Sequence, residues 1–183
     1  MYLTHQKLKT TDKDRIKIWL NDEWQIKYDA FNDIFKRNKF YLENAKMALC
    51  LGARTEQEVK ALQDLGIDSI GVDLVPFPPY TEEGDIHNLK YKNHIFDLVF
   101  TNIIDHSLYP EKFVSETERV CLVDGIIIIH LQLGDNIDDF TETIIQTPKT
   151  IISYFKKFTL LESKPIKNLH DQMHWECIFK RTS

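Results

Sequence analysis

Hydrophobic and charged positions alternate through the first forty-odd residues at the spacing of an amphipathic helix. Ile16, Leu20, Trp24 and Phe31 recur among lysine, arginine and acidic residues, close to the helical period of about 3.6. The pattern predicts that residues 1–44 form a helical lead-in, with its apolar side packed against the rest of the protein.

From residue 45 the pattern changes to short apolar runs separated by amphipathic stretches. The last of four such runs contains four consecutive isoleucines and is apolar on both faces. This is typical of a strand in the middle of a sheet, covered by helices on both sides. The four runs predict buried strands at 47–51, 69–74, 96–100 and 126–131.

Amphipathic stretches between these runs predict helices. The first is expected at 55–65, with Thr55 as its N-cap and Glu58 as the capping-box partner three residues later. Two further helices begin with proline in the first turn, a position that proline tolerates well. They are expected at 110–120 and from Pro148 to about Phe158.

Two apolar runs near the end of the chain, at 158–164 and 173–179, predict a hairpin. Their connection is too short for a crossover helix, so the two strands are expected to pair antiparallel. Earlier, Pro76, Pro78 and Pro79 exclude helix and indicate an extended loop.

The succession of elements therefore predicts one α/β domain over residues 1–183, with the lead-in at 1–44 and the core at 45–183. The core is expected to be a Rossmann-like, mostly parallel sheet with helices on both faces and an antiparallel C-terminal hairpin.

Composition narrows the function classes. The 23 Lys+Arg against 28 Asp+Glu give a formal charge of −5, which provides no general attraction for phosphate backbones, so nucleic acid is not the expected partner. No apolar run approaches the roughly 20 residues that span a bilayer. The polar residues 1–7 do not look like a secretory signal, and we expect a cytoplasmic protein.

Metal binding is not expected either. The three cysteines, Cys50, Cys121 and Cys177, lack metal-ligand spacing. His170 and His174 stand four residues apart, but they fall across a loop and a strand start rather than on one helix face.

The loops after the parallel strands are the expected place for a ligand, because strand ends and helix starts meet there. Gly52 follows the first strand directly and allows a ligand to approach the backbone. Asp73 ends the second strand 21 positions later, close to the roughly 20 residues that separate such a glycine from a ribose-binding acid. Asp85 adds a second carboxylate near the same crevice.

These segments together resemble the successive motifs of class I methyltransferases, which depend on S-adenosyl-L-methionine. Within this class the resemblance is to the methyltransferase type 11 family. The resemblance covers residues 45–131 and is carried by 48–58, 70–74, 84–86 and 96–102. It implies a seven-stranded sheet and S-adenosyl-L-methionine as cofactor.

The resemblance also implies roles for particular residues. The loop of Gly52, Ala53, Arg54 and Thr55 would lie beside the methionine part of the cofactor. Asp73 with Leu74 would hold the ribose, and Asp85 with Ile86 would frame the adenine. Asn102, which follows the fourth strand, would lie near the reactive methyl group.

The glycine-rich loop departs from the family pattern. An acidic residue and three alternating glycines are usual there, whereas this chain has Cys50, Gly52, Arg54 and Glu56 in the variant Leu-Gly-Ala-Arg-Thr. Two hypotheses remain open, an active methyltransferase and a catalytically inactive methyltransferase-like binding module. A nicotinamide-linked oxidoreductase is disfavoured by the missing Gly-x-Gly-x-x-Gly and by the closing hairpin.

Candidate catalytic residues follow the fourth strand. Asp105 and His106 stand at the expected position for a general base, because histidine titrates near neutrality and a neighbouring carboxylate can orient it. The alternative is a pair that stabilises the loop. His130, near the end of the fifth strand, has two interpretations: a side chain that faces the crevice or, more commonly at such positions, a core histidine. No residue pattern identifies the methyl acceptor or an oligomeric state.

Overall fold

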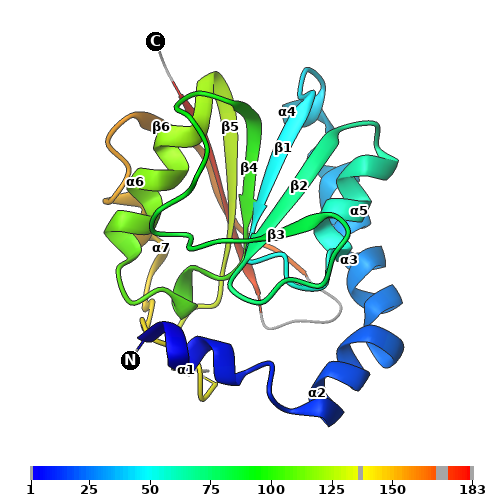
Figure 1. Ribbon diagram of the computed structural model, residues 1–183. Helices are drawn as coiled ribbons and strands as arrows, with labels where there is room; N and C mark the ends of the chain where they lie inside the picture. Colours follow the sequence, from blue (N-terminus) through cyan, green and yellow to red (C-terminus); the bar gives the residue numbers. More distant parts are fainter. Residues whose placement is uncertain (1, 136–137, 168–172, 182–183) are drawn as a thin grey trace.

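The computed structural model describes residues 2–135, 138–167 and 173–181. They form one seven-stranded sheet in the order β3-β2-β1-β4-β5-β7-β6, drawn in Figure 1. β1 to β5 run parallel, and β7 pairs antiparallel with both β5 and β6. The strands are β1 (Met47–Leu51), β2 (Asp68–Asp73), β3 (Thr81–Glu83), β4 (Phe96–Thr101), β5 (Cys121–Leu131), β6 (Phe158–Pro165) and β7 (Trp175–Arg181).

The predicted fold class is confirmed, since the sheet is mostly parallel and ends in an antiparallel pair. The short strand β3 lies inside the segment that the prolines marked as a loop. Thr81 pairs with Gly71 of β2, and a Cβ on that glycine would overlap the Thr81 side chain. The missing side chain at position 71 therefore lets β3 join the edge of the sheet.

Helices cover both faces of the sheet (Figure 1). α3 (Trp24–Arg37) and α5 (Gln57–Asp64) pack on one face, where Phe35 meets the ring of Phe100 at 5.0 Å between centroids. α6 (Pro110–Val120) and α7 (Pro148–Ile152) pack on the other. Two apolar layers result, one on each side of the sheet.

The lead-in is helical, as predicted, but it is broken into several pieces. These are α1 (Tyr2–Leu8), α2 (Lys13–Lys17), the π-helical turn η1 (Ile18–Asp22), α3, and α4 (Lys39–Leu42). The side chain of Asp12 caps α2 by accepting from the backbone N–H groups of Asp14 and Arg15. The breaks carry α1 and α2 away from the sheet faces to the end of the sheet where β1 and β2 finish (Figure 1).

Two predicted helix boundaries are wrong. α5 begins at Gln57, and Glu56 rather than Thr55 precedes it, in a left-handed conformation with φ of 69°. The Thr55 hydroxyl instead donates to the Gln57 side chain at 2.7 Å. The capping box fails because Glu56 turns the chain to reach another partner, described below.

The last predicted helix is also too long. α7 ends at Ile152, since Glu118 Oε1 accepts the backbone N–H groups of Lys156 and Lys157 at 2.8 and 2.7 Å and fixes a turn. Phe158 then begins β6 opposite Arg181 of β7.

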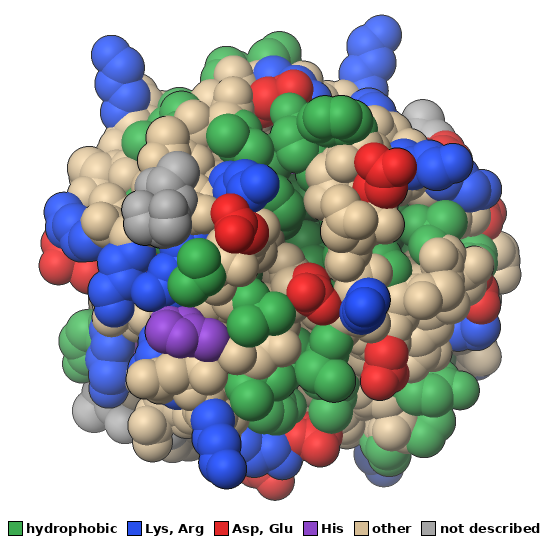
Figure 2. Space-filling model, turned by 90° about the horizontal axis from the view of Figure 1, so that it is seen from above, with side chains coloured by type: hydrophobic (Ala, Val, Ile, Leu, Met, Phe, Trp, Pro, Cys, Tyr) green, Lys and Arg blue, Asp and Glu red, His purple; other side chains and the backbone are tan. Residues whose placement is uncertain are grey.

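The end of the molecule opposite α1 and α2 faces the reader in Figure 2. Acidic and basic side chains are interspersed there among hydrophobic ones. This end of the molecule therefore presents no continuous field of one sign.

Candidate active site

A cavity of about 480 Å³ lies at the carboxyl ends of the parallel strands. The loops after β1, β2 and β4 form one wall, and residues from α1, α2, η1 and α3 form the other. Ligands of open α/β sheets bind at this place. The cavity therefore holds both the expected site and residues from the distant lead-in.

Gly52 occupies the turn after β1 in a conformation that only glycine adopts without strain, with φ of +85°. Its backbone N–H donates to the carbonyl of Val72 at 2.7 Å. A Cβ at this position would overlap the side chain of Ile103, which follows β4. The glycine thus lets the loops after β1 and β4 meet at the floor of the cavity.

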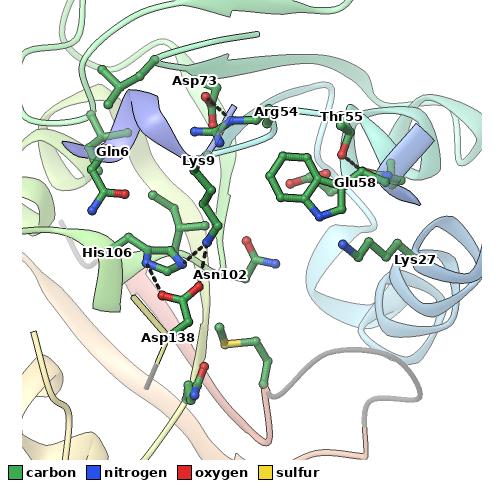
Figure 3. A pocket seen from close by; sticks show the side chains of 18 of the residues that line it. Gln6, Lys9, Lys27, Arg54, Thr55, Glu58, Asp73, Asn102, His106 and Asp138 are labelled. Carbon is green, nitrogen blue, oxygen red and sulfur yellow. Dashed lines mark hydrogen bonds and ion pairs between the residues drawn. The ribbon is translucent and has the colours of Figure 1, made fainter. Parts of the chain in front are cut away.

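Asp73 ends β2 and is 7% exposed at the cavity wall. Its Oδ1 accepts from Arg54 Nε at 2.9 Å and from the backbone N–H of Val75 at 2.8 Å. The guanidinium of Arg54 also lies 5.9 Å from the ring of Trp19. Arg54 therefore occupies part of the cavity while it fixes the carboxylate (Figure 3).

Glu56 replaces a glycine of the family pattern and makes two bonds of its own. Its Oε1 accepts from the backbone N–H of Tyr80 and, at 2.6 Å, from that of Thr81. Burial raises the pKa of Glu56, and these two donors oppose the rise. The residue ties the loop after β1 to the start of β3, which explains why the capping box does not form.

Of the nine residues expected to contact the cofactor, eight line the cavity. They are Gly52, Arg54, Thr55, Asp73, Leu74, Asp85, Ile86 and Asn102. Ala53 is the exception, because its side chain is fully buried and its carbonyl accepts from the Thr81 hydroxyl at 2.8 Å. The structure therefore places the Ala53 side chain away from the cavity, and its contact with the cofactor stays a prediction.

The two candidate bases are not equivalent. His106 lines the cavity, and its Nδ1 lies 2.9 Å from the carbonyl of Phe140. Asp105 does not line the cavity, is 4% exposed, and comes no closer than 4.0 Å to His106 Nε2. Burial raises the pKa of Asp105. The structure therefore places Asp105 behind the cavity lining, and its role as a base beside His106 stays a prediction.

Lys9 and Asp138 join His106 in what we term the cavity cluster (Figure 3). Lys9 Nζ lies 2.9 Å from Asp138 Oδ2 and 3.3 Å from His106 Nε2. Lys9 follows α1, and Asp138 lies in the loop after β5. Sequence reasoning missed both, since charged residues in a polar helix and an acidic loop have no distinguishing spacing.

A second histidine belongs to the core. His130 Nε2 lies 3.0 Å from Glu176 Oε2, which also accepts from Asn38 Nδ2 at 2.8 Å. We term these three residues the enclosed cluster, because the side chains of His130 and Glu176 have no exposed surface. Within the described part of the chain, His130 Nδ1 and Glu176 Oε1 have no hydrogen-bond partner.

Of the two histidines considered as metal ligands, only one lies among the described residues. His170 lies outside the described residues, whereas His174 is described and donates its backbone N–H to the carbonyl of Leu131 at 3.2 Å. Over residues 2–135, 138–167 and 173–181, no three His, Cys, Asp or Glu side chains gather as a metal site would need.

Comparison with known proteins identifies the class. Residues 49–129 match the sequence model of a family described as "Methyltransferase domain". This segment is a class I methyltransferase domain. The cofactor of the class is S-adenosylmethionine, and the matched segment contains the loop at Gly52, Asp73, Asp85 and Asn102. A comparison with curated protein sequences finds no match.

Solved methyltransferases have the same fold at low sequence identity. The 1,6-didemethyltoxoflavin-N1-methyltransferase of Burkholderia thailandensis, with bound 1,6-didemethyltoxoflavin and S-adenosylhomocysteine, is 13% identical with a TM-score of 0.71, covering 99% of this chain and 88% of that chain. A SAM-dependent methyltransferase from Archaeoglobus fulgidus is 13% identical, with a TM-score of 0.65 over 87% of this chain and 97% of the other. A third, from Clostridium acetobutylicum, is 14% identical, with a TM-score of 0.65 over 85% and 92%.

Over the described residues, each helix is too short or too polar to cross a bilayer.

Proposed function

We propose that this protein transfers a methyl group from S-adenosylmethionine to an acceptor held in the same cavity. The observation that carries the proposal is that the backbone at Gly52 and the carboxylate of Asp73 line one cavity. Asp85, Ile86 and Asn102 line it as well. The set offers a close backbone approach, a carboxylate for ribose hydroxyls and a wall for a purine.

The residues present fit the cofactor. Arg54 and Val75 both bond Oδ1 of Asp73, so Oδ2 is the oxygen that we assign to the ribose. Asp85 Oδ1 is held by the backbone N–H of His87 at 2.8 Å, beside the position that we assign to the adenine. When bound, S-adenosylmethionine supplies an electrophilic methyl group on a sulfonium.

Arg54 is the residue whose side chain must change position for the cofactor to fit. Its guanidinium lies in the cavity on Asp73 and near Trp19. Cofactor binding must keep the Nε bond to Oδ1 while the terminal nitrogens turn toward the cofactor carboxylate. We assign this carboxylate to Arg54, because a guanidinium presents its terminal N–H groups as a planar fork.

His106 is the residue that we assign to proton removal. A carbonyl oxygen can only accept, so the contact with Phe140 places a proton on Nδ1 and leaves the lone pair on Nε2. Lys9 lies on the Nε2 side. His106 Nε2 would accept the proton that the acceptor loses on methylation.

Calorimetric titration with S-adenosylhomocysteine tests the cofactor site without knowledge of the acceptor. We expect saturable binding by the wild-type chain and weaker binding by Asp73→Ala. The loss is about 1–3 kcal/mol, the usual cost of leaving a buried hydrogen-bonding group without its partner. No binding by the wild-type chain at millimolar concentration contradicts the proposal.

Asp68→Ala is the matched control. Asp68 is an exposed carboxylate at the opposite end of the same strand, away from the cavity. The control is expected to bind S-adenosylhomocysteine like the wild-type chain. Equal losses in the two variants would mean that Asp73 acts through the stability of β2 rather than through the ligand.

The ion pair of Arg54 with Asp73 favours a second candidate function, a catalytically inactive binding module. In that case the arginine occupies the ribose site permanently. Arg54→Ala separates the candidates: the module predicts no binding of S-adenosylhomocysteine by the wild-type chain and binding by the variant. An active methyltransferase predicts binding by the wild-type chain and weaker binding by the variant.

A further inference from the structure

Four basic side chains from four different segments line the cavity. Lys9, Arg15, Lys27 and Arg54 come from the end of α1, α2, α3 and the loop after β1. Three of them have a carboxylate partner. The pairs are Lys9 with Asp138, Lys27 with Glu23, and Arg54 with Asp73.

Arg15 differs from the other three. Within the part of the chain that the structure describes, no carboxylate forms an ion pair with it. Its guanidinium lies 5.3 Å from the ring of Phe140, and Lys9 Nζ lies 5.2 Å from the same ring. The aromatic ring thus holds two cations at one side of the cavity, a favourable arrangement for each cation separately.

The charges around Phe140 do not balance. Arg15 and Lys9 contribute two positive charges, and Asp138 contributes one negative charge. Asp105 lies nearby but does not line the cavity, and burial raises its pKa. Over the whole lining, four basic side chains face five acidic ones, Glu23, Glu58, Asp73, Asp85 and Asp138. The positive excess is therefore local: among the lining residues beside the Phe140 ring, Lys9 and Arg15 exceed Asp138 by one charge.

Burial makes this excess costly. It lowers the pKa of Lys9 even though Asp138 opposes the change. An anion brought between Lys9 and Arg15 would offset the cost, because charges attract more strongly where water is partly excluded. The cavity is therefore complementary to a negatively charged group on this side.

The same side of the cavity is enclosed by polar contacts. Gln6 Nε2 donates to the carbonyl of Phe140 at 2.9 Å and to Glu142 at 3.1 Å, and the Tyr2 hydroxyl donates to the carbonyl of His106 at 3.0 Å. His5 Nδ1 lies 2.9 Å from Glu142. α1 is thus fastened to the loops after β4 and β5, which favours a small molecule over a macromolecule as the occupant.

We propose that the methyl acceptor is a small molecule with an anionic group, a carboxylate or a phosphate, bound between Arg15 and Lys9. This inference rests on the proposed function, because it names the acceptor class of the same cavity. The cofactor has one carboxylate, which we assigned to Arg54 on the opposite wall. Arg15 is therefore left for a second anion, close to His106 and its assigned proton transfer.

Titrations with simple anions test the inference. Benzoate and phenyl phosphate are the two anionic probes, with benzamide and phenol as their uncharged counterparts. Each is titrated by NMR into the wild-type chain with and without saturating S-adenosylhomocysteine. We expect at least one anion to bind about tenfold more tightly than its counterpart, and the stronger of the two identifies a carboxylate or a phosphate.

Arg15→Gln should abolish this preference and raise the Kd of the anion about tenfold, while the Kd of S-adenosylhomocysteine stays within twofold. Arg15→Lys keeps the charge and should retain part of the preference. Lys13→Gln is the matched control, because it removes one positive charge from an exposed position of the same short helix. Circular dichroism checks that each variant is folded.

The outcomes are distinguishable. Equal effects of Arg15→Gln and Lys13→Gln, or equal binding of charged and uncharged probes, would overturn the inference. Weaker S-adenosylhomocysteine binding by Arg15→Gln with an unchanged anion Kd would assign Arg15 to the cofactor and also overturn it. Absence of S-adenosylhomocysteine binding by the wild-type chain contradicts the proposed function alone, because the anion titrations are also made without it.

Discussion

The enclosed cluster and the cavity cluster contain the same kinds of group in different surroundings. Each places a histidine beside a carboxylate, with a third polar side chain on the same acid or ring. In the enclosed cluster the side chains of His130 and Glu176 have no exposed surface. In the cavity cluster those of Lys9, His106 and Asp138 keep 18%, 19% and 46%.

This difference separates a structural role from a ligand-binding one. Glu176 Oε2 bonds side chains from β5 and from the residue between α3 and α4, so it links the sheet to the lead-in. A ligand has no access there. The cavity cluster presents the same chemistry to an open space, where a bound molecule can replace or extend the contacts.

The largest expected effect is in the enclosed cluster. Glu176→Ala should lower the free energy of unfolding by about 3–5 kcal/mol, because it leaves His130 and Asn38 buried without their shared acceptor. Urea denaturation measures the change. Glu162→Ala, at a half-exposed position of β6, is the control and should cost less than about 1 kcal/mol. Similar losses in both variants would contradict a special role for the enclosed cluster.

A substitution at the floor of the cavity tests whether the loops there are packed as tightly as the core. Gly52→Ala should destabilise the protein by about 1–3 kcal/mol, because it adds a strained positive φ and a contact with Ile103. Gly66→Ala is the control, with a similar φ of +84° but no atom within 4 Å of the added Cβ. Thermal denaturation should show a larger loss at Gly52; equal losses would mean that Ile103 moves aside freely.

The strands and their ends could be predicted from sequence, whereas the acceptor side of the cavity could not. Apolar runs predict β1, β2, β4 and β5 from local sequence. Residues at the ends of these strands or directly after them, such as Asp73 and Gly52, are positioned by the sheet. Lys9 and Asp138 meet across 129 positions of sequence, through a bent lead-in whose breaks have no periodic signal. The hydrogen bonds of Glu56 to the start of β3 could not be predicted either, because a glutamate before a helix is expected to be a solvent-exposed cap residue.

Acid should weaken the enclosed cluster. Burial tends to raise the pKa of Glu176, but the bonds from His130 and Asn38 outweigh it, and the pKa lies below the ordinary 4.5. Glu176 therefore stabilises the fold above pH 4.5, and this contribution is lost as the pH falls through the lower folded pKa.

Urea midpoints between about pH 3 and pH 6 check the acid prediction. The difference between the wild-type chain and Glu176→Gln should shrink toward the acid end. A difference that is constant over this range would show that Glu176 does not titrate with unfolding.

The smallest expected effect is on the alkaline side and has the opposite sign. Burial lowers the pKa of Lys9 from 10.5, so the unfolded chain holds this proton more firmly than the folded one. The stability of the wild-type chain relative to Lys9→Met should therefore rise as the pH increases from the folded pKa of Lys9 toward 10.5. Urea midpoints of the two proteins from pH 8 to about pH 10 measure the change, and a falling difference would contradict the buried position of Lys9.

The fastening of α1 to the loops after β4 and β5 has a kinetic consequence. The backbone N–H groups of Glu142 and Thr143 both donate to the carbonyl of Asp105 at 2.9 Å, and the Glu142 side chain is at the same time bonded by Gln6. A product leaving on this side must wait for these bonds to open together. Turnover would then be paced by a local unfolding event, visible as hydrogen exchange at these two amides, rather than by the chemical step.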